Sequence, residues 1–236
     1  MANKIIVANL KNYMSYNDTV NYLDQVESLK NEVIFVPTNI YIPYFIERKH
    51  LVGIQDISHL EGITSGEVSA DQAKSIGIKY TIIGHNERIV YLNESNKIIN
   101  KKINNALSND LKIIFCVGEK EKTSLDNTFK YIKEVIENTL FKLNNEQIKN
   151  IIIAYEPFWT IGSDIIPDND FTQKIVKFIK DLIFDRFNFK ISVLYGGSVK
   201  ESSISDLEKI SNIDGFLIGE ASIDGCKFVN LVRSTK

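Results

Sequence analysis

The most informative segment of the chain reads Ala154-Tyr155-Glu156-Pro157-Phe158-Trp159-Thr160-Ile161-Gly162-Ser163-Asp164. Its first two residues continue the three isoleucines that precede them, and Ile151 to Tyr155 form an apolar run typical of a strand buried on both faces in a parallel sheet. Glu156 stands where that strand ends, before the single tryptophan and a tip of small residues. A carboxylate at the carboxyl end of a buried strand, followed by a loop with a flexible tip, is the arrangement of a catalytic base under a lid. The plainer alternative is a glutamate that merely leaves the core at a strand end.

Short apolar runs recur along the chain, and amphipathic segments of helical spacing separate them. The runs are Ile5–Ala8, Val33–Val36, Leu51–Ile54, Tyr80–Ile83, Ile113–Val117, Ile151–Tyr155, Ile191–Tyr195 and Phe216–Ile218. Ser69 with Gln72 predicts a capping box at one helix start, and Pro167-Asp168 predicts another start. The weakest units are the second, where Tyr41 to Lys49 allows only a short helix, and the last, Cys226 to Val232. Alternating strands and helices predict a parallel sheet with right-handed crossovers.

Eight such units in 236 residues leave about 30 residues per unit, which suits an α/β fold of the (β/α)8 TIM-barrel type, eight parallel strands ringed by helices. An open doubly wound sheet is the alternative, but it normally places a glycine-rich turn after the first strand. Here that strand is followed by Asn9-Leu10-Lys11-Asn12, without glycine. Because no linker or low-complexity tract marks a boundary, we predict one catalytic domain spanning residues 1–236.

Composition excludes several classes of protein. Hydrophobic residues make up 44% of the chain, enough for a real core, and the net charge of −2 gives no field that favours nucleic acid or an anionic membrane. No apolar run approaches a membrane span, and the N-terminus turns polar at Asn9, too early for a signal peptide. Cys116 and Cys226 make no disulfide framework, and Cys116 is most simply a core residue. We therefore expect a soluble, cytoplasmic protein with no nucleic-acid or membrane partner.

In such a barrel the site lies at the carboxyl ends of the strands. The polar residues there are Asn9 and Lys11 after the first strand, His85, Asn86, Glu87 and Arg88 after the fourth, Glu156 after the sixth, Ser198 after the seventh, and Glu220 and Ser222 after the eighth. An amine, an imidazole and a carboxylate can thus meet at one mouth. A hydrogen-bonded structural histidine and a solvated lysine are the plainer interpretations of His85 and Lys11. His50 and His59 have no comparable neighbours and receive no role.

The turns after the seventh and eighth strands predict an anion site. Gly197 and Ser198 allow close approach of the backbone, and a helix that begins at Glu220 or Ala221 aims free N–H groups at a ligand. Phosphate binding at these two strands is common in this fold. Two ordinary glycine turns are the plainer alternative.

Motifs for other chemistry are missing. The sequence has no His/Cys/Asp cluster at metal spacing, no phosphate-binding G-x-x-x-x-G-K-[ST] loop, no G-x-S-x-G and no H-E-x-x-H. We therefore predict no metal and no organic cofactor. For a carboxylate, an imidazole and an amine around a phosphate, the simplest chemistry is proton transfer beside a carbonyl.

These residues resemble the triosephosphate isomerase family over the whole chain. The matching segments are Asn9-Leu10-Lys11, Gly66-Glu67, Ile82-Ile83-Gly84-His85-Asn86-Glu87-Arg88, Cys116-Val117-Gly118-Glu119, Ala154-Tyr155-Glu156-Pro157-Phe158-Trp159, Tyr195-Gly196-Gly197-Ser198-Val199 and Asp214-Gly215-Phe216-Leu217-Ile218-Gly219. The resemblance implies interconversion of dihydroxyacetone phosphate and glyceraldehyde 3-phosphate, in glycolysis and gluconeogenesis.

The resemblance also implies roles for individual residues. Glu156 is then the base that moves the proton, His85 the electrophile at the substrate oxygens, and Lys11 the balancing charge. Asn9 helps to hold the substrate, and the N–H groups of Gly162, Ser198, Gly219 and Glu220 bind the phosphate. The family is itself a standard example of tuned pKa values, so a neutral histidine and a water-excluding loop are implied by the resemblance alone. It further implies a homodimer in which the loop 62–67 reaches the partner and Glu67 contacts Arg88.

The chain departs from the family pattern at four places. Asn86 replaces a serine, so that an amide must remake any hydrogen bond to the base, and Ser65 replaces a threonine in the interface loop. Glu220 replaces a glycine in the phosphate turn, and we predict that its carboxylate points away from the phosphate. The lid is shorter, with Asp164-Ile165-Ile166 before Pro167. It is predicted to close through Gly162 and Ser163 without the customary partner for Tyr195.

Two other readings fit the residues less well. A sugar-phosphate epimerase is expected to bring metal-ligand histidines and aspartates to several strand ends, and the sequence lacks them. A catalytically impaired barrel that retains phosphate-ligand binding is expected to have lost Lys11, His85 or Glu156, and all three are present.

Overall fold

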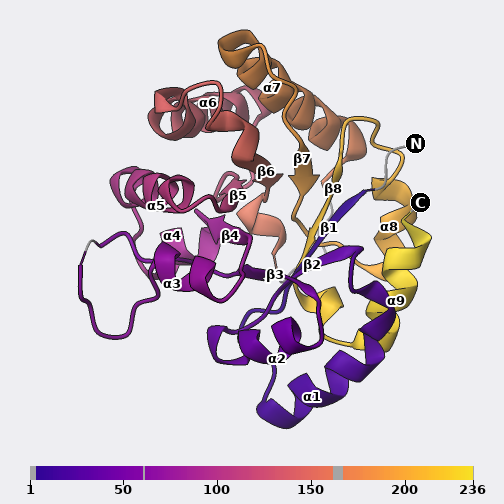
Figure 1. Cartoon of the computed structure of the whole chain (residues 1–236). Coiled ribbons are helices and arrows are strands. Elements are labelled where there is room, and N and C mark those ends of the chain that lie inside the picture. Colours follow the sequence, from indigo (N-terminus) through magenta and orange to yellow (C-terminus); the bar gives the residue numbers. More distant parts are fainter. Residues whose placement is uncertain (1–3, 61, 162–166, 236) are drawn as a thin grey trace.

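The structure, a computed structural model, describes residues 4–60, 62–161 and 167–235. Eight parallel strands close into one barrel in the order β1 to β8, each beside the next in sequence. They are β1 Ile5–Asn9, β2 Val33–Val36, β3 Leu51–Ile54, β4 Tyr80–Ile83, β5 Lys112–Val117, β6 Ile151–Tyr155, β7 Val193–Tyr195 and β8 Gly215–Ile218. Helices surround this ring on the outside (Figure 1). The predicted TIM barrel is confirmed.

Helices follow the strands, with short 3-10 turns between some of them. The α-helices are α1 Tyr16–Gln25, α2 Ile42–Glu47, α3 Ala70–Ser75, α4 Asn86–Tyr91, α5 Asn96–Ser108, α6 Leu125–Thr139, α7 Asn169–Phe187, α8 Glu201–Leu207 and α9 Gly225–Ser234. The 3-10 turns are η1 Glu27–Leu29, η2 Asn39–Tyr41, η3 Leu140–Lys142, η4 Ile148–Asn150, η5 Phe158–Thr160 and η6 Glu220–Ser222. The predicted capping box of Ser69 and Gln72 opens α3, and Asp168 caps α7 by accepting from the Asp170 N–H.

One strand is shorter than predicted. β7 begins at Val193, whereas the apolar run begins at Ile191. Val193 pairs with Ile153 of β6, and Leu194 pairs with Gly215, the first residue of β8. Residues before Val193 therefore have no strand beside them on the β8 side, although Ile191 remains buried.

Two apolar clusters follow from the alternation of side chains along each strand. One fills the barrel with Val7, Ile34, Val36, Ile82, Ile114, Cys116, Ala154, Leu194 and Leu217. The other packs the outer faces of the strands against the helices. Two residues further along their strands, the same inward face carries Asn9, Gly84, Gly118, Glu156, Gly196 and Gly219. At the carboxyl rim, therefore, small residues leave room for a ligand, while Asn9 and Glu156 point into that room.

The seam between the first and last strands needs a glycine. β1 pairs with β8 from Ile5 and Gly215 to Ala8 and Ile218. A Cβ atom on Gly215 would lie 1.9 Å from the carbonyl oxygen of Ile5. Only a residue without a side chain lets the barrel close at this point.

Within the described ranges, no helix combines the length and the apolar character that crossing a bilayer requires.

Candidate active site

Glu156 follows β6 and is held between the strands on either side of it. Its N–H donates to Val117 O at 2.9 Å. A Cβ atom on Gly118 would lie 1.9 Å from its carbonyl oxygen, and one on Gly196 would lie 2.5 Å from its Cγ. The residue is only 2% exposed. Its Oε1 lies 3.6 Å from His85 Nε2, while its Oε2 has no hydrogen-bond partner among the described residues. One carboxylate oxygen is therefore left for a ligand.

The buried thiol of Cys116 lies next to Glu156. Burial is the main cause that raises the pKa of this thiol well above its ordinary value, and the neighbouring carboxylate raises it further. Cys116 is therefore a neutral core residue, as predicted, and not a nucleophile.

His85 is the residue that caps α4. Its Nδ1 accepts a hydrogen bond from the Glu87 N–H at 3.3 Å. When Nδ1 acts as the acceptor, the neutral imidazole carries its proton on Nε2. That nitrogen faces Glu156 and the mouth of the barrel. The first turn of a helix thus fixes both the orientation of the ring and its tautomer.

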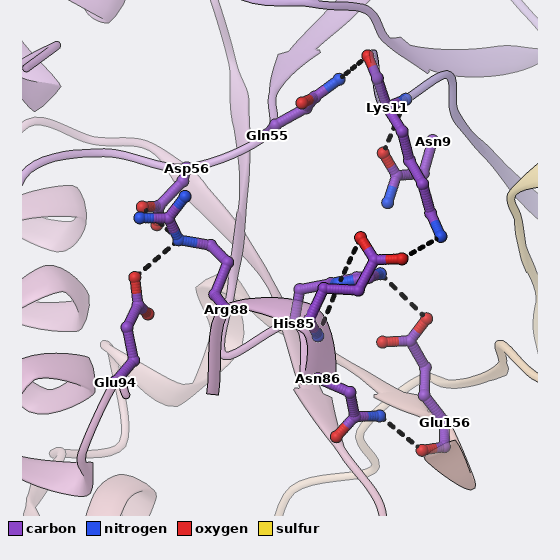
Figure 2. A network of polar contacts seen from close by, with 10 residues as sticks. Asn9, Lys11, Gln55, Asp56, His85, Asn86, Arg88, Glu94 and Glu156 are labelled. Atoms are coloured by element: carbon purple, nitrogen blue, oxygen red, sulfur yellow. Dashed lines mark hydrogen bonds and ion pairs between the residues drawn. The ribbon is translucent and has the colours of Figure 1, made fainter. Parts of the chain in front are cut away.

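Asn86 contacts the base, but not at its carboxylate. Its Nδ2 donates to the backbone carbonyl of Glu156 at 2.7 Å, and the residue is 2% exposed. The amide therefore holds the main chain at the end of β6. Figure 2 shows this bond beside the contact between His85 and Glu156.

Lys11 is fixed at both ends. Its backbone has a left-handed φ of 45°, which is uncommon outside glycine. Its carbonyl oxygen accepts from Thr38 Oγ1 at 2.6 Å and from Gln55 Nε2 at 2.7 Å, and its N–H donates to Asn9 Oδ1 at 3.3 Å. Its Nζ pairs with Glu87 Oε1 at 2.6 Å. Lys11, His85 and Glu156 point toward one another (Figure 2).

The turn after β8 differs from the prediction. Glu220 to Ser222 form a single 3-10 turn, η6, and the α-helix begins only at Gly225. The hydroxyl and the N–H of Ser222 both bond to the carbonyl of Gly219, at 2.6 and 2.9 Å, which closes the turn early. The leading N–H groups of such a turn have no partner within it, so they remain suited to an anion.

One cavity of about 920 Å³ brings the predicted residues together. Among its lining residues are Asn9, Lys11, His85, Glu156, Ser198, Gly219 and Glu220. Gly162, the remaining predicted ligand, and the predicted lid residues 163–166 lie outside the described residues. Within the described part, no group of three or more His, Cys, Asp or Glu side chains is arranged to hold a metal ion.

Comparison with known proteins agrees with this geometry. The family model for triosephosphate isomerase matches residues 4–235. The chain belongs to the triosephosphate isomerase family. Triosephosphate isomerase of Thermoanaerobacter sp. is 34% identical over 247 positions, which cover 99% of this chain and 100% of that protein. For the enzyme of that name from Dictyoglomus turgidum the identity is 33% over 249 positions, with the same coverage. The enzyme of that name from Mycoplasma genitalium is 31% identical over 245 positions, which cover 99% of each chain.

Family membership confirms the predicted class of enzyme, an aldose–ketose isomerase that acts on a triose phosphate. The triosephosphate isomerase fold also places near the site two groups of polar residues that received no role from the sequence. Glu119, after β5, is one of them. Its carboxylate accepts from Trp159 Nε1 at 2.8 Å and from the Tyr155 hydroxyl at 3.1 Å. Burial raises the pKa of Glu119, and these two bonds oppose the rise.

The tryptophan is also covered on its ring face, where Lys122 Nζ lies 5.6 Å from the ring centroid. The described residues that lead into the predicted lid are thus anchored by one carboxylate and one cation. In the sequence, Glu119 and its two donors Tyr155 and Trp159 lie in two of the segments that match the family. Tyr195 lies nearby, and burial raises the pKa of its hydroxyl while a hydrogen bond with the Thr160 side chain opposes the rise.

The second group of polar residues is a cluster of four charged side chains, Asp56, Arg88, Glu94 and Lys102. Arg88 Nε lies 2.8 Å from Asp56 Oδ2 and 2.6 Å from Glu94 Oε1, and Lys102 Nζ pairs with the same two oxygens. Arg88 therefore has partners within its own chain, and its predicted contact with Glu67 of a second copy remains a prediction. Asp56 lies 46 residues before Lys102, and Asp56, Glu94 and Lys102 belong to no motif, so only the fold reveals the cluster.

Proposed function

We propose that this chain interconverts dihydroxyacetone phosphate and glyceraldehyde 3-phosphate, with Glu156 as the base, His85 at the substrate oxygens and Lys11 as the balancing cation. The observation that carries these roles is the meeting of the three side chains, from three different strand ends, on one cavity. The buried Glu156 carboxylate, with one oxygen near His85 Nε2 and the other without a partner, is suited to take up a proton.

The proposed reaction moves one proton from carbon to carbon. Glu156 removes a proton from the carbon beside the carbonyl, and the electron pair shifts to the carbonyl oxygen to give an enediolate. His85 gives its Nε2 proton to that oxygen and takes up the proton of the neighbouring hydroxyl group, while the Lys11 ammonium stabilises the negative charge. Glu156 then returns the proton to the neighbouring carbon, so that substrate and product have the same composition.

The phosphate is assigned to the turns after β7 and β8. The backbone N–H groups of Ser198, Gly219 and Glu220 are proposed as its donors, because these residues line the same cavity as Glu156. Gly162 is proposed as a further donor by resemblance.

The decisive test is a coupled isomerase assay on glyceraldehyde 3-phosphate with wild type and Glu156→Asp. The shorter side chain withdraws the carboxylate by about one methylene, so we expect kcat to fall about a hundredfold with little change in KM. Glu146→Asp, the same change on an exposed residue paired with Lys149, should leave kcat unchanged. A wild-type chain that binds inorganic phosphate but shows no turnover would instead support the catalytically impaired barrel.

We further propose that the enzyme is a homodimer formed through the loop 62–67. This loop belongs to the long segment between β3 and α3 that projects from the barrel (Figure 1), and its Ile63 is wholly exposed. A cavity of about 330 Å³ beside Lys11, lined in part by Gln55, Arg88, Tyr91 and Leu92, offers a second copy's loop a place to pack. Tyr91 and Leu92 are 70% and 59% exposed, which supports a covering partner.

Sedimentation velocity tests the dimer. Ile63→Asp places a charge where the loop would be buried, so we expect a shift from dimer to monomer. Ile76→Asp, at a 48% exposed isoleucine after α3, serves as the control and should leave the mass unchanged. A monomeric wild type at micromolar concentration would contradict the dimer.

The pairing of the first strand with the last supports the proposal that residues 1–236 work as one catalytic domain. The family's role in glycolysis supports a cytoplasmic location. Fractionation of the producing cells tests the second point.

A further inference from the structure

The cluster of Asp56, Arg88, Glu94 and Lys102 is balanced in charge and buried except for Arg88, whose side chain is 33% exposed. Side-chain exposure is 11% for Asp56, 5% for Glu94 and 2% for Lys102. Each anion shares one oxygen between the two cations, while Asp56 Oδ1 and Glu94 Oε2 are buried without hydrogen-bond partners in the described chain. Buried ion pairs repay their desolvation poorly, so stability alone is a weak reason for such a cluster.

The cluster connects to Lys11 by two routes. Gln55, directly before Asp56, donates to the Lys11 carbonyl at 2.7 Å. Glu87, directly before Arg88, pairs with Lys11 Nζ at 2.6 Å. The contact between Asp56 and Arg88 joins these two pairs of neighbours and closes a ring of contacts around Lys11. Figure 2 shows the part of this ring in which Gln55 bonds to Lys11.

Lys11 needs such support because its backbone is strained. A left-handed φ on a residue other than glycine persists only where the surroundings over-determine it. Loss of the contacts of Asp56 with Arg88 and Lys102 removes one link between the segment that holds the Lys11 carbonyl and the helix that holds its amine. The two ends of Lys11 can then shift slightly relative to each other.

We propose that Asp56 is a positioning residue for Lys11, and that protonation of Asp56 opens this ring and lowers isomerase activity at acidic pH. The proposal rests on the function proposed above for Lys11. Asp56 is faced by Arg88 from α4, by Lys102 from α5 and by Glu94 from the connection between them.

The burial and the charged neighbours of Asp56 place its protonation near pH 6. Burial raises the pKa of Asp56 to about 6, whereas Lys102 and Arg88 act to lower it and Glu94 to raise it. Because this pKa is higher in the folded chain than in the unfolded chain, the folded state takes up more protons between about pH 6 and 4. Asp56 therefore makes the fold more stable, not less, as the pH falls through that window. Loss of activity through Asp56 is then separable from unfolding.

The test compares kcat/KM for glyceraldehyde 3-phosphate in wild type and Asp56→Asn from pH 5 to 8.5. In the ratio of the two values, titration of the substrate phosphate and of shared groups cancels. We expect the ratio to be about tenfold or more at pH 8 and to fall toward one by pH 5, because the variant mimics protonated Asp56 at every pH. Asp110→Asn, which breaks a surface pair with Lys74, should give a ratio near one throughout. A ratio for Asp56→Asn that is near one at pH 8, or that does not change with pH, overturns the proposal.

A second variant separates positioning from folding. Asp56→Asn combined with Lys102→Gln restores the charge balance and keeps the pair of Arg88 and Glu94. We expect this double variant to unfold at a Tm close to that of wild type while its activity at pH 8 stays low. Full activity at pH 8 in the double variant would show a purely structural role and overturn the proposal. An inactive wild type would refute the proposed function itself, whereas an active wild type with a flat ratio refutes only the role of Asp56.

Discussion

At residue 86 the family pattern has a serine that can bond to the base. This chain has an asparagine there, and its amide bonds to the main chain of the base instead. The amide reaches the carbonyl oxygen of Glu156 at 2.7 Å, so it secures the main chain of the base and leaves the carboxylate to His85. The sequence predicted that an amide would contact the base. It could not predict the acceptor atom, which depends on where α4 lies relative to the end of β6.

Glu220 is the departure with the clearest electrostatic consequence. A carboxylate at 4 Å from a phosphate charge costs on the order of 4 kcal/mol at an effective dielectric constant of 20. Glu220 lines the cavity, and we expect its carboxylate to point away from the phosphate. Calorimetry should then show that Glu220→Gly changes the affinity for inorganic phosphate by less than tenfold. Tenfold or tighter binding in the variant would mean that the carboxylate faces the anion.

At the scale of elements, the rim glycines of β5 and β7 hold the base. A Cβ atom at residue 196 would meet Glu156 Cγ at 2.5 Å, so Gly196→Ala should displace the carboxylate. We expect kcat to fall about a hundredfold, since small displacements of a catalytic group have effects of that size. Steady-state kinetics and thermal unfolding measure the two consequences.

Gly77→Ala is the matched control for this substitution. Gly77 has a positive φ of 90° and open space around its Cα, so alanine there should destabilise the fold by about 1 kcal/mol without changing kcat. Equal losses of kcat in the two variants would mean that general destabilisation, and not the position of Glu156, causes the effect.

The elements that the sequence predicted best are those with a continuous apolar run or a capping motif. Seven of the eight strands fall within a residue of their predicted limits, because alternation inside a barrel buries both faces of each strand. The helix α8 has no such signal, since Glu201-Ser202-Ser203-Ile204 offers little apolar spacing. The cluster around Asp56 was invisible for a related reason, because its partners meet only when β3, α4 and α5 are packed together.

At the scale of the whole molecule, the buried position of His50 makes the stability of the fold depend on pH. The ring lies between Phe35 and Phe45, and both of its nitrogens are buried without partners in the described residues. Burial lowers the pKa of His50 to about 4 from its ordinary value of 6.5, with Glu27 opposing the shift. The unfolded chain therefore binds the proton first, and stability is lost as the pH falls from about 6.5 to 4.

His50→Leu removes this titrating group and keeps an apolar side chain between the two phenylalanines. We expect the Tm of wild type to fall more steeply than that of the variant between pH 6.5 and 4, and the two curves to run parallel above pH 7.5. Differential scanning calorimetry across this range provides the measurement. Parallel curves throughout would show that His50 is protonated equally in both states.

The glycine at the seam has a consequence for how the protein is made. Ile5 leaves the ribosome long before Gly215, yet they are paired neighbours. A nascent chain therefore keeps the outer edge of β1 without its final neighbour until β8 has been synthesised. Such an edge attracts other strands, so premature termination before Gly215 should yield an aggregating fragment instead of a smaller working enzyme.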